Sequence, residues 1–362
     1  MRSTRMKMAA ALAIPALFLT ACSDSGTESG SSDSGAAGSG ISGSIKASGS
    51  SAQKNAMFEW INAFQTANPD VTIDYQANGS GAGIQDFNND QTAFAGSDAV
   101  MKDDEQADAD ARCASGPAIH IPMVGGAIAI AYNLDGVDSL TLTPEVIAGI
   151  FDSSITKWND EKITEINPGV DLPDATIAQF HRSDESGTTA NFASYLAATA
   201  ADIWTYEVGK AWDAPGGQGA KGSDGVASIL SSTKNSIGYV ELSFVMDGDL
   251  KAAMVDNGAG AVEATSANAS TAIGAAEVVG TGNDLALQLD PTIAEAGAYP
   301  IVLVTYEITC ETGLSADQVA VVKPFLQYAA SDAGQGILDG IGYVPITGDL
   351  LTKVQASVDA IS

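Results

Sequence analysis

The sequence predicts an α/β protein built from two lobes with largely parallel sheets. Its 362 residues can form two compact units, and segments with helical periodicity alternate with short strand-like segments. Two long runs rich in Val and Ile, residues 118–132 and 300–309, are too interrupted to span a membrane and are expected to be buried strands. Because they lie far apart in the sequence, they are candidates for paired crossings between the lobes.

The first elements of the folded region follow from local patterns. Four apolar residues at spacings of three and four predict one buried helix face: Met57, Trp60, Ile61 and Phe64. Asn68-Pro69 ends this helix, and residues 71–75 alternate as a strand. Residues 78–83 are expected to form a glycine-rich loop, and residues 94–98 a short strand. Thr143-Pro144-Glu145 has the hydroxyl cap, proline and acid typical of a helix start.

The N-terminus predicts export and anchoring. Basic residues precede the short apolar segment 8–19, and Leu19-Thr20-Ala21-Cys22 resembles a lipobox, in which Cys22 is lipidated after cleavage. Residues 1–21 are therefore expected to be a signal peptide. Residues 22–40 would be the lipidated cysteine and a Ser/Gly-rich linker, which holds the protein outside the cytoplasm at the cell membrane. The alternative is an ordinary signal peptide with a chance cysteine.

The composition argues against two classes of function. The 16 basic and 45 acidic residues give a formal net charge of −29, which opposes the binding of a nucleic-acid polyanion. The only two histidines, His120 and His181, lie far apart, and no Cys/His cluster exists. The sequence thus predicts no metal centre, no cofactor and no nucleic-acid partner. His120 is expected in the core, and a structural or exposed role is expected for His181.

Two cysteines remain once Cys22 is assigned to the lipid. An even pair in an exported protein favours a disulfide between Cys113 and Cys310. Two buried free thiols are the alternative.

Three loops indicate an oxyanion site. They combine glycine, small and hydroxyl-bearing residues where a strand leads into a helix: residues 48–52, 78–83 and 182–189. Free backbone N–H groups at a helix N-terminus, beside Ser or Thr hydroxyls, bind oxyanions well. One such loop indicates little, since most are turns and caps, but three in one chain, one of them carrying Arg182, favour an anion site.

Asp98 is the unexpected element of this pattern. A carboxylate would repel an oxyanion unless the ligand supplies a proton for it to accept. Such an acceptor would select protonated phosphate over fully ionised sulfate.

These residues resemble the phosphate-binding proteins of high-affinity phosphate ABC transporters, which have the type II periplasmic-binding-protein fold with a hinge and an interlobe cleft. The similarity extends over residues 44–344. The matching motifs are, in order, Phe94-Ala-Gly-Ser-Asp98, Ile155-Thr-Lys-Trp-Asn-Asp160, Asn167-Pro168-Gly169, Leu172-Pro173, Arg182-x-Asp184-x-Ser186-Gly187-Thr188-Thr189, Gly222-x-Asp224-Gly225 and Ile237-Gly-Tyr-Val-Glu241.

The resemblance implies a set of phosphate-binding residues. The expected donors of hydroxyl, amide or guanidinium groups are Ser51, Ala52, Ser80, Arg182, Ser186, Gly187 and Thr188. Asp98 would accept the phosphate proton, and Asp184 would orient Arg182. Two positions depart from the family pattern: Ala52 replaces an aromatic residue, and Gly81 replaces a second serine.

The resemblance also implies the organisation and partners of the protein. Lobe I is expected to comprise residues 41–125 and 301–362, and lobe II residues 126–300. The protein would act as a monomer that captures inorganic phosphate, closes around it and docks on the permease subunits.

Two other functions stay open from the sequence. A secreted phosphohydrolase could use Ser186 as its nucleophile, although only His181 could serve as its base and neither a metal cluster nor a Gly-x-Ser-x-Gly elbow is present. A binding protein for another tetrahedral oxyanion, such as sulfate or molybdate, is the second, and Asp98 argues against it.

Overall fold

The computed structural model describes residues 40–113, 115–248 and 250–362. The predicted signal peptide, Cys22 and nearly all of the linker lie outside these residues. Within the described part of the chain, no helix is both long and apolar enough to cross a membrane.

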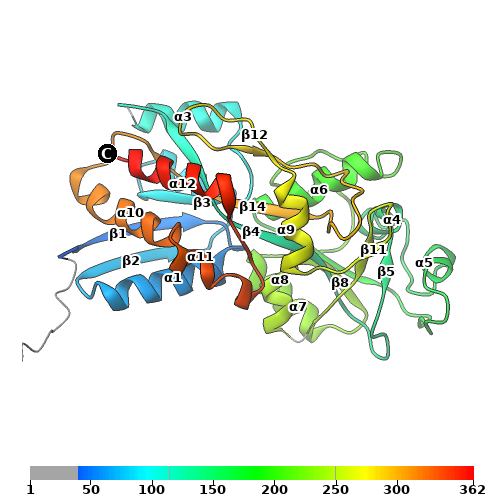
Figure 1. The fold of residues 1–362 in the computed structure, drawn as a ribbon. Coiled ribbons are helices and arrows are strands. Elements are labelled where there is room, and N and C mark those ends of the chain that lie inside the picture. Colours follow the sequence, from blue (N-terminus) through cyan, green and yellow to red (C-terminus); the bar gives the residue numbers. More distant parts are fainter. Residues whose placement is uncertain (1–39, 114, 249) are drawn as a thin grey trace, which may run out of the picture. The chain divides into compact units, whose positions relative to one another are not determined.

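The architecture is α/β, as predicted, and Figure 1 shows helices packed around a continuous sheet. The helices are α1 (Lys54–Ala67), α2 (Ser80–Asn88), α3 (Asp103–Cys113), α4 (Pro144–Phe151), α5 (Glu161–Ile166), α6 (Gly187–Thr199), α7 (Gly222–Ser232), α8 (Leu242–Asp247), α9 (Ser266–Gly274), α10 (Ala316–Ala329), α11 (Asp332–Gly336), the 3-10 helix η1 (Asp339–Ile341) and α12 (Gly348–Ala360).

A ten-stranded sheet organises the chain, with its main strands in the order β2-β1-β3-β14-β4-β8-β6-β7. These strands are β1 (Gly43–Gly49), β2 (Val71–Gln76), β3 (Phe94–Ser97), β4 (Ala118–Asn133), β6 (Ala178–Arg182), β7 (Gln218–Ala220), β8 (Ser236–Glu241) and β14 (Val302–Cys310). Two short strands, β9 (Lys251–Ala252) and β15 (Val344–Pro345), pair with β4 at its sides. The remaining short strands form two small sheets: β5 (Thr141–Leu142), β10 (Met254–Asp256) and β11 (Ala261–Val262) in one, and β12 (Glu277–Val278) and β13 (Leu287–Gln288) in the other.

The strand β4 joins the two halves of the main sheet. Its first part pairs with β14, from Ala118↔Cys310 to Ala127↔Val302, and its last part pairs with β8. All residues of β14, and all of β4 except Asn133, are buried. The two apolar runs are thus neighbouring buried strands, as predicted. Strands buried on both faces read as continuous apolar runs, which explains their composition.

The sheet is less parallel than the alternating pattern suggests. The outer pairs β1/β2, β1/β3, β6/β8 and β6/β7 are parallel. The central pairs β3/β14, β14/β4 and β4/β8 are antiparallel, because the long strands β4 and β14 run in opposite directions. Local periodicity cannot reveal the direction in which a distant strand returns.

Most local predictions agree with the structure, and one is corrected. The apolar face of α1 is buried, α1 ends at Ala67, and Thr143 caps α4 through its side chain. The loop expected at residues 78–83 is shorter than predicted, because α2 begins at Ser80. Gly79, with φ +105°, makes the turn into this helix, and the small residues after it form its first turn.

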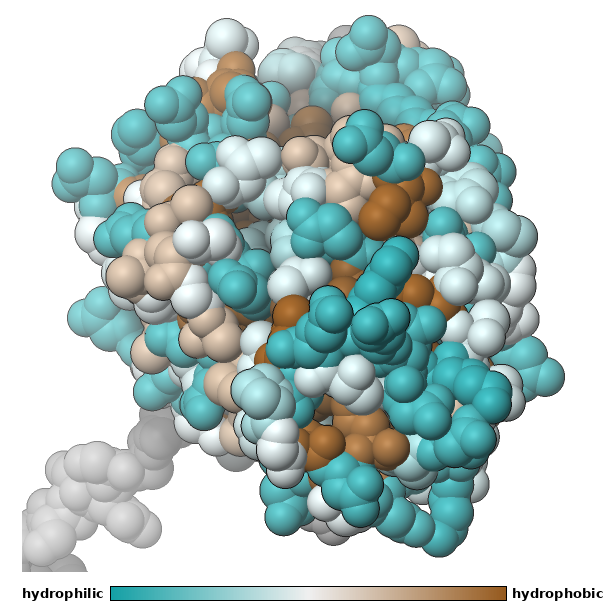
Figure 2. Space-filling model, turned by 90° about the vertical axis from the view of Figure 1, so that its right-hand side faces the viewer, coloured by the Kyte–Doolittle hydropathy of each residue, from teal (hydrophilic) through white to brown (hydrophobic). Residues whose placement is uncertain are grey.

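Few of the described residues are large apolar residues with exposed side chains. Those in the described residues are Phe58, Val100, Val208, Met246 and Val279. On the face drawn in Figure 2, apolar residues form small patches separated by hydrophilic side chains.

The predicted disulfide is confirmed. Cys113 at the end of α3 is bonded to Cys310 at the end of β14, and the two cysteines are separated by 197 residues in the sequence. Both are buried. The bond ties the last turn of α3 to the centre of the sheet.

Replacing both cysteines by serine is expected to lower the free energy of unfolding by roughly 2–5 kcal/mol, since the bond closes a long loop in the unfolded chain. Urea unfolding of the variant and the oxidised wild type measures the difference. Equal midpoints and slopes would contradict a stabilising role.

Candidate oxyanion-binding site

The predicted site residues lie at the ends of three strands and at the N-termini of the following helices. Gly49 and Gly96 are in register on the parallel strands β1 and β3, so the segments containing Ser51 and Asp98 leave the sheet together. Arg182 ends β6, and Gly187 begins α6. Ligands of open α/β sheets bind at such carboxyl ends of strands.

Asp98 is the centre of the site. It is 3% exposed, and its Oδ1 accepts hydrogen bonds from the hydroxyls of Ser50 and, at 2.9 Å, Thr305. Its Oδ2 accepts from the Thr188 hydroxyl at 3.0 Å. An ionised carboxylate offers about four acceptor positions, so three hydroxyl donors leave one position on Oδ2.

Two opposing influences act on the pKa of Asp98. Burial raises the pKa, because it disfavours the charged form. The hydrogen bonds from Ser50, Thr305 and Thr188, and the charge of Arg182, counteract this increase. The pKa of Asp98 is raised overall, and the three hydroxyl groups limit the increase.

The N-terminus of α6 faces Asp98. Ser186 caps this helix, its hydroxyl accepting from Thr189 N at 3.3 Å, and Gly187 N donates to the Ser80 hydroxyl at 3.0 Å. A Cβ on Gly187 would lie 2.7 Å from the Asp98 Cβ, so only glycine allows this approach. The site thus combines amides, hydroxyls and the positive end of a helix.

Arg182 is paired with Asp184. The guanidinium is 2% exposed, and its Nε and Nη2 donate to the two oxygens of Asp184, at 2.8 Å and 2.5 Å. Gly222 N also donates to Asp184, at 3.0 Å. Burial alone would raise the pKa of Asp184, but Arg182 and the Gly222 amide hold it below its ordinary value. Asp184 thus orients Arg182 and leaves Nη1 outside the pair.

The loop after β1 reaches the start of α7. The Ser51 hydroxyl lies 3.1 Å from the Ser223 hydroxyl and accepts from Ser223 N at 3.0 Å. The Ala52 amide donates to the Ser50 hydroxyl at 3.1 Å. Ser51 and Ala52 therefore lie beside the Asp98 cluster, on the side of α7.

The structure also explains one departure from the family pattern. A Cβ on Gly81 would lie 2.5 Å from the Cβ of Glu185 and 2.2 Å from its Oε2. A serine at this position would therefore need a different placement of Glu185.

Some residues of the cluster are not predicted by the sequence. Ser50, Thr305, Asn191 and Ser223 contact Asp98 or Ser51, and Asn191 Nδ2 donates to the Asp98 carbonyl at 2.7 Å. Ser50 lies within a predicted loop. In the sequence, Thr305 could have been noticed as a polar residue inside the predicted buried strand of residues 300–309.

The two histidines lie outside the cluster. His120 is buried, its Nδ1 lying 2.9 Å from Asp284 and its Nε2 accepting from Met101 N. His181 stacks on Trp212 and contacts the Arg182 carbonyl through Nδ1. Burial lowers the pKa of His181. Among the described residues, no group of three or more His, Cys, Asp or Glu side chains could hold a metal ion.

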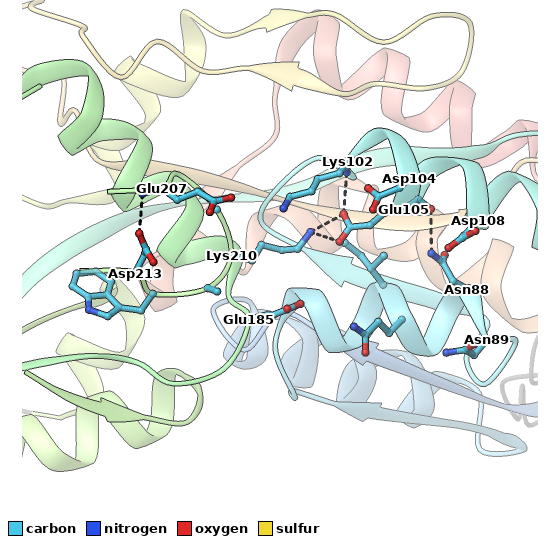
Figure 3. Close-up of a pocket in the computed structure, with 15 residues that line it drawn as sticks. Asn88, Asn89, Lys102, Asp104, Glu105, Asp108, Glu185, Glu207, Lys210 and Asp213 are labelled. Carbon is cyan, nitrogen blue, oxygen red and sulfur yellow. Dashed lines mark hydrogen bonds and ion pairs between the residues drawn. The ribbon is translucent and has the colours of Figure 1, made fainter. Parts of the chain in front are cut away.

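A cavity of about 420 Å³ lies beside the site, between α2, α3 and residues 207–213 (Figure 3). Lys210 reaches across it to Glu105, with its Nζ 2.6 Å from Oε1. The other charged residues that line the cavity are Lys102, Asp104, Asp108, Glu185, Glu207 and Asp213. This excess of acids disfavours an anion, so the cavity does not compete with the Asp98 cluster as an oxyanion site.

The chain is similar to known proteins over most of its length. Residues 34–333 match the model of the PBP superfamily domain. Phosphate-binding protein PstS 2 of Mycobacterium tuberculosis is 40% identical over 362 residues, covering 97% of both chains. Phosphate-binding protein PstS3 of Mycobacterium bovis is 42% identical over 322 residues, covering 88% of this chain and 86% of the relative.

Solved structures show the same fold. A high affinity periplasmic phosphate-binding protein, PfluDING, bound with phosphate, aligns with a TM-score of 0.69 at 24% identity, covering 86% of this chain and 93% of the other. The match fits the two-lobed periplasmic-binding fold expected from the sequence. The chain belongs to the PBP superfamily and, within it, to the family of the phosphate-binding proteins PstS.

Proposed function

We propose that this protein captures inorganic phosphate outside the cytoplasm and delivers it to the permease of an ABC transporter. The observation that carries the proposal is the buried Asp98 carboxylate, which has one acceptor position left and faces the α6 N-terminus. The names of the relatives support it, as does the phosphate-bound structure of a putative phosphate ABC transporter substrate-binding protein from Clostridium perfringens, which aligns with a TM-score of 0.62 at 22% identity.

In this proposal, neutral donors and one guanidinium hold the anion. The donors are Ser51, Ala52, Ser80, Arg182, Ser186, Gly187 and Thr188. Several of them now contact one another or Asp98, as Gly187 contacts Ser80. Their polar atoms therefore already converge on one place, and binding exchanges these contacts for contacts with phosphate oxygens.

Asp98 would supply selectivity. Both forms of phosphate present near neutral pH carry a proton that can be donated to the remaining position on Oδ2. Sulfate carries none, so it would leave a buried acceptor unpaired and facing a like charge.

The proposed lobes comprise residues 41–125 with 301–362, and residues 126–300. Polar contacts connect them: Lys210 with Glu105, Lys54 Nζ with Asp224 at 2.7 Å, and Gly187 N with Ser80. We infer that phosphate closes the lobes by a hinge at the β4 and β14 crossings, and that the closed monomer docks on the permease.

We also infer that Cys22 carries a lipid and that residues 23–40 tether the domain to the outer face of the cell membrane. The sequence of residues 19–22 supports this placement. Mass spectrometry of the membrane-extracted protein tests it, because a lipidated N-terminus must begin at Cys22.

Arg182→Ala is expected to weaken phosphate binding by about 10- to 100-fold, since a hydrogen bond to a charged group contributes about 1.5–3 kcal/mol. Ser80→Ala, which removes a neutral donor, should cost up to about tenfold. Calorimetric titration with phosphate measures both effects. Lys157→Ala, which removes an exposed ion pair with Asp174, is the control and should bind as the wild type does. Unchanged affinity in Arg182→Ala would contradict the assigned site.

Asp98→Asn is expected to reduce the preference for phosphate over sulfate by about tenfold or more, because the amide adds a donor and removes the like charge. Titrations of the wild type and the variant with each anion give the two ratios. Full retention of sulfate rejection would rule out the proton-acceptor role.

The protein is proposed to be a binding protein rather than an enzyme. The Ser186 hydroxyl accepts from the Thr189 amide as a helix cap, and His181 contacts a backbone carbonyl. We therefore expect no release of phosphate from a chromogenic ester. Turnover that disappears in Ser186→Ala would instead establish the phosphohydrolase.

A further inference from the structure

A second buried carboxylic acid lies close to Asp98. Glu307 is in the middle of β14, is 0% exposed, and pairs in register with Gly96, two residues before Asp98. It follows Thr305 by two residues, so it lies on the face of β14 from which Thr305 reaches Asp98. No sequence pattern assigns it a role.

A hydrogen-bonded path connects this region to the ligand loop. Gln53 is fully buried, and its Nε2 donates to the Tyr75 hydroxyl at 3.0 Å. The Tyr75 hydroxyl donates to the Ser50 carbonyl at 2.8 Å, and the Ser50 side chain donates to Asp98. Gln53 thus supports the loop that carries Ser51 and Ala52.

Glu307 lies at the start of this path. The Gln53 amide packs over Gly96, where a Cβ would lie 2.2 Å from Nε2, and it interacts with the Glu307 side chain. Among the described residues, neither the Gln53 Oε1 nor either Glu307 oxygen has a well-formed hydrogen-bond partner. Gln53 and Glu307 thus bring three buried acceptor atoms together, and a proton on Glu307 would supply a donor that the ionised carboxylate lacks.

The surroundings of Glu307 favour this neutral form. The charge of Asp98 raises the pKa of Glu307, and the charge of Glu307 raises the pKa of Tyr75. Both neighbours become negative when they ionise, so neither stabilises an ionised Glu307. Arg182 is the cation acting on Asp98, and it is already paired with Asp184.

In the part of the chain that the structure describes, the helices that pack most closely on β14 bring no free cation to Glu307. Helices α6 and α9 contain no charged residue. On β4, His120 pairs with the neighbouring Ile308 and contacts Asp284. Arg112 of α3 lies at the far end of β14, where it contacts Cys310, Asp90 and Thr92.

Burial raises the pKa of Glu307 to about 8, and the charge of Asp98 adds to the increase while Gln53 opposes it. The acid is therefore neutral at pH 7. The site itself holds one guanidinium against the carboxylates of Asp98 and Asp184, so a further negative charge here would oppose an incoming anion.

We propose that Glu307 is a positioning residue of the phosphate site: in its neutral form it holds Gln53 and the loop of residues 50–52, and loss of its proton weakens phosphate binding. The inference rests on the proposed phosphate function. Since the phosphate complex favours the protonated acid, affinity falls as the pH rises above about 8.

The test compares the full-length wild type with Glu307→Gln, which retains a donor for Gln53 but has no proton to lose. Phosphate dissociation constants are measured by calorimetry at pH 7 and pH 9. Dividing the wild-type dissociation constant by that of the variant at each pH cancels the effect of the ionisation of phosphate itself. This ratio of dissociation constants is expected to rise about tenfold from pH 7 to pH 9, because about a tenth of an acid with a pKa of 8 is protonated at pH 9.

A ratio that is the same at both pH values overturns the proposal, since a purely structural role would weaken binding equally at each. Glu241→Gln is the matched control. Glu241 is equally buried and its pKa is raised by burial to about 8, but its Oε2 accepts from Ser243 and not from Gln53. The proposal is also overturned if Glu241→Gln no longer loses phosphate affinity between pH 7 and pH 9 while Glu307→Gln still does. A wild type that binds no phosphate at either pH refutes the proposed function instead.

A second measurement keeps the test valid if Glu307→Gln does not fold. In Glu241→Gln, Glu307 is the buried acid expected to be neutral at pH 7, and infrared spectroscopy detects its protonated carboxyl group. The band is expected at pH 7, is lost at pH 9 without phosphate, and is retained at pH 9 with saturating phosphate. Absence of the band at pH 7 overturns the proposal.

Discussion

The hydrogen bonds to the Asp98 carboxylate are the interaction on which the site depends. Ser50 comes from the loop after β1, Thr305 from β14 and Thr188 from α6, so one side chain connects three distant parts of the chain. Burying a carboxylate without such donors would be costly, and its pKa would rise until it became neutral. The three hydroxyls both limit the rise in the pKa of Asp98 and determine which of its acceptor positions is left unoccupied.

The charged groups around Asp98 are arranged in keeping with the cost of burying this carboxylate. A protein with a net charge of −29 can bind an anion only through local complementarity. The structure provides it with dipoles and hydroxyls at the α6 N-terminus, and with a guanidinium moderated by Asp184. Burial raises the pKa of the acids Glu241 and Glu307, which favours their neutral form over a further negative charge.

Helix α6 is also connected to a polar contact at the edge of the neighbouring cavity. Ser186 N donates to the Lys210 carbonyl at 2.9 Å, and the Lys210 side chain pairs with Glu105 of α3, the helix that follows Asp98 in the chain. Lys210 and Glu105 have side-chain exposures of 6% and 21%, so water screens their attraction less than it would that of a surface pair. The cap of α6 and the segment after Asp98 are thereby held in one arrangement.

The sequence by itself determined the local elements and the chemical types of the site. Periodicity and capping residues defined α1, α4, β2 and the two buried strands, and three Gly/Ser loops, one of them carrying Arg182, indicated an oxyanion site. Tertiary structure decided the antiparallel centre of the sheet, the early start of α2, and the contacts of Ser50 and Thr305 with Asp98. The physical reason is that Asp98 and Thr305 meet only through the register of β14 against β3, across 207 residues of sequence. No local pattern encodes such a register, whereas a helix face or a cap is fixed by neighbours a few residues away.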